Sequence, residues 1–371
     1  MKKIIALVLA MVMMLSLAAC GSNEAGEENG EYAIAMVTDY GDINDQSFNQ
    51  TTWEAVKEYC EAEGLKYEYF KPASDSDEDR ISQIENAIDS GYNVIVLPGY
   101  AFANAIIATA DNYPEAYFVG LDVSEYDLTA NGWTIPENVY CAVYQEELCG
   151  YMAGYAAVKL GYTQLGYCGG MAVPAVLRFG YGFLQGVDAA AVETGADVTI
   201  LWGWANQFYG DADVTAVMDT WYSEGTELVF ACGGGVYTSV AEAAAKVGGK
   251  VIGVDVDQAG IIDGMYGEGM TVTSAMKGLK PTTVTMLGKI VAGEFKGGFV
   301  ETLGLVSENP EDNYVQIPYE STQFDDNFTV EDYEALVAAM YNGEVVVNSD
   351  ISGAAADYVT VVTVQDLGNI K

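Results

Sequence analysis

The stretch Thr38-Asp-Tyr-Gly-Asp-Ile-Asn-Asp-Gln-Ser-Phe-Asn-Gln50 connects an apolar run, Ala33–Val37, to a helical pattern. The apolar run predicts a short buried strand. Ser47 and Gln50 have the spacing of a capping box, which predicts that a helix starts there. Open α/β sheets bind ligands at loops of this kind, between the carboxyl end of a strand and the N-terminus of a helix. The stretch therefore predicts an α/β fold with a ligand site at its first loop.

This first loop offers hydrogen-bond acceptors and one flat apolar ring. Its candidate ligand-binding residues are Asp39, Asn44, Asp45 and Phe48. Such a set suits a neutral, hydroxyl-rich ligand that carries a ring better than it suits a phosphate. The alternative is that these residues only form turns and helix caps, and for Asp42 and Gly41 the pattern does not decide between the two.

Outward from this loop, strand-like apolar runs alternate with helical patterns as far as Lys277. Regular alternation predicts parallel sheets covered by helices on both faces. Breaks at 122–138 and after Lys277, with a last strand candidate at 357–364, indicate two doubly wound lobes with a hinge and a cleft between them. We expect the N-terminal lobe to comprise 32–124 plus about 275–315, and the C-terminal lobe 125–274 plus about 316–371.

The composition excludes several classes of function. The chain has 54 acidic and 15 basic residues, a formal charge of −39, which disfavours nucleic acid polymers, anionic membrane surfaces and phosphorylated ligands. It has no histidine, which removes the commonest general base and the usual zinc ligands. None of its six cysteines forms a CxxC pair, and the five after Cys20 lie in apolar surroundings that predict core positions. We expect neither enzymatic activity nor a cofactor or metal.

The N-terminus resembles a bacterial lipoprotein signal peptide. Met1-Lys-Lys is followed by an apolar run at 4–17 and by Leu17-Ala-Ala-Cys20. The run is too short for a stable membrane span. We expect residues 1–19 to be a signal peptide, Cys20 to be the lipidated N-terminus, and 20–31 to be a flexible tether on the extracytoplasmic face of the cell membrane. The alternative is an ordinary secretory signal in which Cys20 is incidental.

Later loops add further candidates. In Val251-Ile-Gly-Val-Asp-Val-Asp-Gln258, Asp255 stands at the end of a predicted strand. The segment Phe230-Ala-Cys-Gly-Gly-Gly-Val236 contains glycines, Gly234 among them, that allow a ligand to approach the backbone amides closely. Lys277 follows another predicted strand and is the basic residue that we expect in the cleft, as a donor to a hydroxyl beside Asp255. The alternatives are a helix-capping acid and a surface lysine.

An aromatic loop at 202–210, Trp-Gly-Trp-Ala-Asn-Gln-Phe-Tyr-Gly, follows a further predicted strand. Aromatic side chains in a loop can serve as stacking platforms, and Phe208 could face Phe48 across the cleft. The alternative is that these rings only fill the surface between the lobes.

Five segments together resemble the basic membrane protein family, the nucleoside-binding lipoproteins of ABC importers. They are TDYGDINDQSFNQTTWEA from Thr38, YPEAYFVGLD at 113–122, GYCGGMAVPAVLRFGYGFLQG at 166–186, FACGGG and VIGVDVDQ. The resemblance covers nearly all of the mature chain in the right order. It implies a type I periplasmic-binding-protein fold, with two α/β lobes joined by crossing segments.

The resemblance also implies roles for particular residues. Two phenylalanines that sandwich the base fall on Phe48 and Phe208, and Trp204 is the alternative to Phe208 because this loop departs from the family's short polar loop. A ribose-contacting lysine falls on Lys277, and a glycine wall lies near Gly234. The acidic and amide ligands of the family fall on Asp39, Asn44, Asp45, Asp122 and Asp255.

The sequence therefore predicts a lipid-anchored, monomeric solute-binding protein that closes two lobes over a nucleoside, a purine nucleoside by expectation, and delivers it to an ABC permease without covalent chemistry. Three alternatives remain. They are a binder of a sugar or another ring-bearing ligand, a ligand-sensing lipoprotein, and an exported nucleoside hydrolase. The hydrolase would need a metal-bound aspartate cluster, which the sequence lacks.

Overall fold

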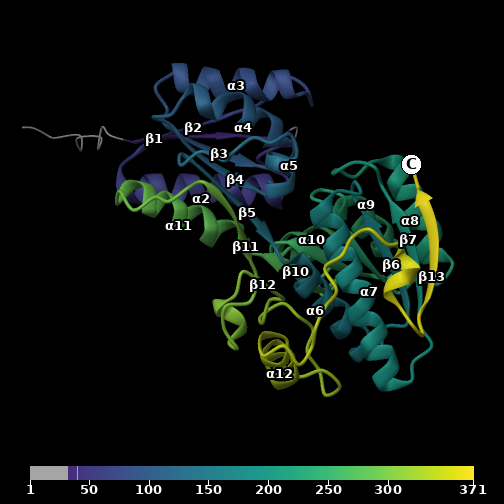
Figure 1. The fold of residues 1–371 in the computed structure, drawn as a ribbon. Coiled ribbons are helices and arrows are strands. Elements are labelled where there is room, and N and C mark those ends of the chain that lie inside the picture. The colour runs from purple at the N-terminus through teal and green to yellow at the C-terminus, as the bar shows by residue number, and fades with distance from the viewer. Residues whose placement is uncertain (1–31, 40) are drawn as a thin grey trace, which may run out of the picture.

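The computed structural model of the chain describes residues 32–39 and 41–371. The predicted signal peptide, Cys20 and the whole of the predicted tether lie outside the described residues. Two lobes, each built on one sheet, make up the described part (Figure 1). Within that part, no helix has both the length and the apolar character that crossing a membrane requires.

The first lobe contains a six-stranded sheet in the order β11-β5-β4-β3-β1-β2, and every strand pair in it is parallel. The second lobe contains a seven-stranded sheet in the order β12-β10-β9-β8-β6-β7-β13, in which only the short β12 runs antiparallel to its neighbour. The strands are β1 Ala33–Val37, β2 Lys66–Phe70, β3 Val94–Pro98, β4 Tyr117–Leu121, β5 Val139–Tyr144, β6 Gln164–Gly169, β7 Thr199–Trp204, β8 Leu228–Cys232, β9 Lys250–Asp255, β10 Thr271–Lys277, β11 Phe299–Leu303, β12 Val315–Gln316 and β13 Thr363–Asn369.

Helices cover both faces of each sheet. Because successive strand residues point to opposite faces, Ile34 and Met36 of β1 share one core with α2, whereas Ala35 and Val37 share another with α3. The helices are α2 Phe48–Glu63, α3 Asp77–Asp89, α4 Ala103–Thr109, α5 Glu125–Thr129, α6 Glu146–Lys159, α7 Pro174–Thr194, α8 Ala212–Ser223, α9 Tyr237–Val247, α10 Ala259–Tyr266, α11 Leu279–Val291 and α12 Val330–Tyr341. The expected pair of doubly wound parallel-sheet lobes is confirmed.

Three segments cross between the lobes, after β5, after β10 and after β11. They are hydrogen-bonded to one another, since the backbone N–H of Gln145 donates to the carbonyl of Leu303 (2.9 Å) and that of Gly278 to the carbonyl of Tyr314 (2.7 Å). This places the lobe boundaries differently from our expectation. Residues 125–144 end in β5, which belongs to the first sheet, and the whole of β10 belongs to the second. The break at 122–138 is a connection within the first lobe, and apolar periodicity does not show which sheet a strand joins.

The last strand begins later than the sequence suggests, at Thr363 instead of residue 357. The carboxylate of Asp188 accepts the backbone N–H groups of Thr360 (2.8 Å), Val361 (2.8 Å) and Val362 (3.2 Å). These groups are therefore unavailable to a strand ladder, although the residues that carry them favour strands.

The cysteines of the described residues occupy the core, as expected. Cys60, Cys141, Cys149, Cys168 and Cys232 are all free and buried. Burial raises the pKa of the Cys60, Cys141 and Cys168 thiols to about 12, so these thiols stay protonated and unreactive at neutral pH.

Candidate ligand-binding site

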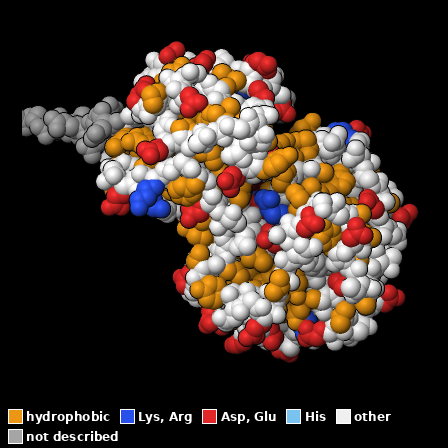
Figure 2. Space-filling view, viewed as in Figure 1, with side chains coloured by type: hydrophobic (Ala, Val, Ile, Leu, Met, Phe, Trp, Pro, Cys, Tyr) orange, Lys and Arg blue, Asp and Glu red, His pale blue; other side chains and the backbone are white. Residues whose placement is uncertain are grey.

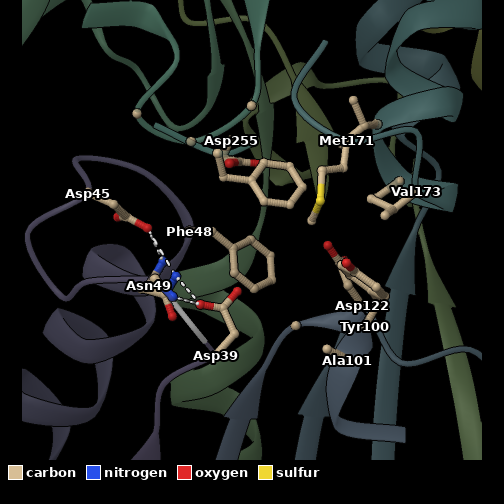
Figure 3. Close-up of a pocket in the computed structure, with 18 of the residues that line it drawn as sticks. Asp39, Asp45, Phe48, Asn49, Tyr100, Ala101, Asp122, Met171, Val173 and Asp255 are labelled. Carbon is tan, nitrogen blue, oxygen red and sulfur yellow. Dashed lines mark hydrogen bonds between the residues drawn. The ribbon is translucent and has the colours of Figure 1, made fainter. Parts of the chain in front are cut away.

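A cavity of about 540 Å³ lies between the lobes, at the carboxyl ends of strands in both sheets (Figure 3). In the first sheet the strand order reverses between β1 and β3, and in the second between β6 and β8. The loops after all four strands line the cavity, through Asp39, Gly99, Met171 and Gly233 among others. The cavity therefore occupies the topological switch point of both sheets, where open α/β sheets bind ligands.

Most of the residues that the sequence pointed to line this cavity: Asp39, Asp45, Phe48, Asp122, Phe208, Gly234, Asp255 and Lys277. Asn44 does not. It is exposed, and its side-chain amide donates to Asp42 (2.8 Å). Asn49 lines the cavity instead, and its amide donates to Asp39 and Asp45, both at 3.1 Å (Figure 3). Asn49 stands in the quoted stretch, and nothing in its place in the first turn of the helix indicated its role.

The helix that carries Phe48 starts where the sequence predicts but is capped by a different residue. The side chain of Ser47 makes no capping bond, so the predicted capping box is wrong. The carboxylate of Asp45 accepts the backbone N–H groups of Ser47 (2.9 Å), Asn49 (3.0 Å) and Gln50 (3.0 Å). Its two oxygens can satisfy several orphan donors at once, which a single hydroxyl cannot do. Ser47 is thereby free to bond elsewhere.

Direct hydrogen bonds join the lobes beside the cavity. The hydroxyl of Ser47 donates to the carboxylate of Asp255 across the cleft (2.6 Å). The side-chain amide of Gln258, also in the second lobe, donates to the backbone carbonyl of Gln46 (3.0 Å). The first ligand loop therefore contacts the second lobe through its own polar groups.

Backbone strain gathers at the cavity. Among the described residues, the non-glycine residues with positive φ are Gln46 (55°), Asp122 (61°), Asn206 (57°) and Asp255 (67°). Three of them line the cavity, and Gln46 makes the bond to Gln258. Such conformations cost on the order of 1–3 kcal/mol each and concentrate at ligand clamps and active sites. This clustering supports a functional role for the cavity independently of its shape.

Lys277 is the centre of a buried charge network, in which its ammonium lies 2.6 Å from Asp122, 3.3 Å from Glu146 and 3.7 Å from Asp255. Burial alone would lower the pKa of Lys277, but the three carboxylates outweigh it and raise that pKa, so the ammonium stays charged. Burial raises the pKa of Asp122 to about 6 despite the opposing attraction of Lys277. Oδ1 of Asp122 is buried without a hydrogen-bond partner, which leaves one acceptor at the cavity unsatisfied.

Two further basic residues line the cavity, so Lys277 is not its only cation. Arg80 pairs with Asp75 and with Asp77 (3.3 Å), and Lys71 pairs with Asp42 (3.1 Å). No motif in the sequence marks Arg80 or Lys71 as a cavity residue. The cavity still carries six acidic residues against three basic ones. On the face drawn in Figure 2, acidic side chains are likewise scattered over both lobes.

Phe208, and not Trp204, is the stacking candidate that the aromatic loop presents to the cavity. Trp204 packs in the second lobe, where its ring contacts those of Tyr167 and Trp202. The ring of Phe208 lies against Gly170, where a Cβ atom would approach it to 2.5 Å. A glycine is needed there so that the ring can reach this position.

The glycines after β8 also serve the packing of the protein itself. A Cβ atom at Gly233 would lie 2.8 Å from the backbone of Gly170, so the loops after β6 and β8 meet backbone to backbone. Gly234 has φ of +52°, and the N–H of Gly235 donates to the carbonyl of Phe208 (2.9 Å). At these glycines two loops of the chain approach each other closely, and the predicted close approach of a ligand to their backbone stays a prediction.

Comparisons with known proteins agree with this geometry. Residues 33–351 match the model of the Bmp family, described as ABC transporter substrate-binding protein PnrA-like. The ABC transporter nucleoside-binding protein BmpA of Lactococcus lactis subsp. cremoris is 31% identical over 275 residues, which are 69% of this chain and 74% of that protein. Basic membrane protein A of Borreliella afzelii is 26% identical over 241 residues, 64% of this chain and 70% of that protein.

The fold is also that of known solute-binding proteins. A crystal structure of an ABC transporter solute-binding protein from Aeropyrum pernix superposes with a TM-score of 0.66 at 21% identity, covering 88% of this chain and 90% of the other. The resemblance seen in the sequence is confirmed, and so is the type I periplasmic-binding-protein fold. The chain belongs to the Bmp family of ABC transporter substrate-binding proteins.

Proposed function

We propose that this protein captures nucleosides, purine nucleosides by expectation, in the cavity between its lobes and delivers them to an ABC permease. The observation that carries the proposal is the combination of an aromatic ring from each lobe, Phe48 and Phe208, with buried carboxylates in one cavity. Its volume of about 540 Å³ lies within the range of roughly 300–1,000 Å³ usual for small-molecule sites. The name of the relative from Lactococcus lactis supports the same class of ligand.

In the proposed complex, each of these side chains makes a ligand contact that suits its chemistry. The rings of Phe48 and Phe208 stack on the two faces of the base, while Asp122 and Asp255 accept hydrogen bonds from ribose hydroxyls. Lys277 donates to a ribose oxygen. A ligand without those hydroxyls would leave Oδ1 of Asp122, which has no hydrogen-bond partner in the protein, unsatisfied beneath it, and this costs more than the loss of an average hydrogen bond.

Isothermal titration calorimetry against nucleosides, free bases, nucleotides and sugars tests the proposal. We expect the tightest binding with purine nucleosides and no heat from sugars. Binding of a sugar alone would support the alternative of a sugar-binding protein. Release of free base during incubation with a nucleoside, measured by chromatography, would instead show a hydrolase.

The acidic lining leads to a prediction about charge. We expect adenosine and guanosine to bind far more tightly than their 5′-monophosphates, because the three basic residues of the cavity are each already paired with carboxylates and six acids line the same space. Calorimetry of each nucleoside and its monophosphate in the same buffer measures the difference. Equal affinities for a nucleoside and its monophosphate would mean that a cation without a carboxylate partner faces the ligand.

Attachment to the membrane is a further part of the proposal. The match at Leu17-Ala-Ala-Cys20, preceded by an apolar run, supports lipidation of Cys20. Mass spectrometry of the protein from its native host is expected to show a diacylglycerol-modified Cys20 as the mature N-terminus. Cleavage at another residue, or an unmodified N-terminus, would refute this part and leave the ligand proposal intact.

A further inference from the structure

The final strand of the chain forms an edge of the second sheet, next to the strand that leads into the cavity. β13 pairs in parallel with β7, and after it the N–H of Ile370 donates to the carbonyl of Trp204 (3.0 Å), the last residue of β7 (Figure 1). The family match ends at residue 351, so β13 lies beyond it. The segment 205–210, here called the Phe208 loop, follows β7 directly.

Lys371 ties this final segment to the Phe208 loop. Its ammonium donates to Oε1 of Gln207 (2.6 Å) and to the carboxylate of Asp211. The amide of Gln207 donates in turn to the carbonyl of Tyr209 (2.8 Å) and to Asp211 (3.0 Å). Asp211 also accepts the first backbone N–H groups of α8, so the cluster fixes the loop to the start of a helix. Gln207 and Tyr209, the neighbours of Phe208 in sequence, both line the cavity.

An irregularity near the end of β13 directs Lys371 toward the Phe208 loop. Its ladder with β7 shifts register between Asp366 and Asn369, and Gly368 has φ of +63° there. Ile370 then lies against Gly203, where a Cβ atom would come within 2.6 Å of its side chain. A bulge of this kind re-aims the end of a strand. The packing of Ile370 and the bonds of Lys371 therefore depend on the same local turn of the backbone.

We propose that β13 and Lys371 brace the Phe208 loop, which makes Lys371 and Gln207 positioning residues for ligand binding. The contacts of Gln207 hold one side of Phe208 and the bond from Gly235 holds its carbonyl, so the ring is placed before the ligand arrives. A pre-organised loop loses less conformational freedom on binding, and this raises affinity without a new ligand contact. The effect on binding rests on the proposed function, whereas the brace itself does not.

The test uses the full chain, with three variants and two measurements. Lys371→Ala removes the brace, Lys371→Arg keeps its charge and donors, and Lys246→Ala removes an exposed lysine that pairs with Asp219 elsewhere in the second lobe (2.8 Å). Hydrogen exchange of the peptide over 203–211 is measured without ligand. The dissociation rates of adenosine and guanosine are measured by stopped flow.

We expect Lys371→Ala to speed exchange in the Phe208 loop and to raise the dissociation rate about threefold to tenfold, with an unchanged thermal midpoint. Lys371→Arg should restore both values, and Lys246→Ala should change neither. Unchanged exchange in Lys371→Ala would overturn the brace, and faster exchange with an unchanged dissociation rate would overturn the positioning role. If the unaltered chain binds neither nucleoside, the proposed function fails, and the exchange measurement still decides whether the brace exists.

Discussion

Lys277→Met is expected to lower the thermal midpoint by about 5–15 °C. The substitution keeps the length of the side chain but removes the cation that lies between Asp122, Glu146 and Asp255. Glu146 keeps its ion pair with Arg178 (2.5 Å), whereas Asp122 loses its ion pair. The Lys277 and Glu146 side chains are 2% and 0% exposed, and removing one partner of a buried pair costs about 3–5 kcal/mol. Differential scanning calorimetry of the ligand-free protein at pH 7.5 measures the change.

Lys280→Met is the matched control, three residues further along. Lys280 makes an equally short ion pair with Glu58 (2.6 Å), but both side chains are at least half exposed, so we expect a loss below about 1 kcal/mol. The difference between Lys277→Met and the unaltered protein should shrink as the pH falls from 8 to 5. Burial already raises the pKa of Asp122 to about 6, and the loss of the ammonium should raise that pKa further, so protonation of Asp122 at low pH removes its repulsion with the neighbouring carboxylates. Equal losses in the two variants would contradict the buried network.

Phe48→Ala is expected to weaken nucleoside binding by tenfold to a hundredfold or more while the protein stays folded. A stacking face is worth about 1–3 kcal/mol per base, at roughly 1.4 kcal/mol per tenfold change in affinity. Phe48 is half-buried at the start of α2 and lines the cavity, and the Lys277 ammonium lies 4.7 Å from the centre of its ring. Phe299→Ala, a half-exposed ring of the first lobe packed on Tyr140, is the control. Calorimetry with adenosine and guanosine measures the change.

Asp255→Ala, measured in the same experiment, distinguishes contacts to the sugar from contacts to the base. It should weaken binding of a nucleoside more than binding of its 2′,3′-dideoxy form, because Asp255 is assigned to ribose hydroxyls. Phe48→Ala should weaken both equally, since stacking acts on the base. If Phe48→Ala unfolds the protein or leaves affinity unchanged, Phe48 is a packing residue and its assigned role is wrong.

The fold could be predicted from the sequence, and most of the predicted site residues line the cavity, because both follow from local pattern. Apolar runs followed by polar loops locate the carboxyl ends of strands, and in a parallel sheet these ends lie at one edge, as those of β1 before Asp39 and of β4 before Asp122 do. The prediction of individual residues failed where two nearby residues could play the same role. Asp45 caps α2 in place of Ser47, and Asn49 lines the cavity in place of Asn44. In each pair the conformation of the backbone decides which residue takes the role, and the sequence pattern does not show that conformation.

Other features depend on contacts distant in sequence, which a pattern does not contain. The assignment of β5 to the first sheet is decided by pairing with β4 and β11, not by its own residues. Arg80 reaches the cavity from the first turn of α3, and Glu146 contacts Lys277, which lies 131 positions later in the chain. The late start of β13 similarly depends on Asp188, which lies far back in the chain.

The burial of the five described cysteines has a practical consequence for observing this protein at work. With Cys20 lipidated as proposed and the core thiols buried, maleimide dyes should leave the native chain unlabelled. A single cysteine placed on each lobe, at exposed sites such as Tyr126 and Val247, would then be the sole point of attachment for a fluorophore. Energy transfer between two such dyes would test in individual molecules whether the lobes open and close, without first removing any native cysteine.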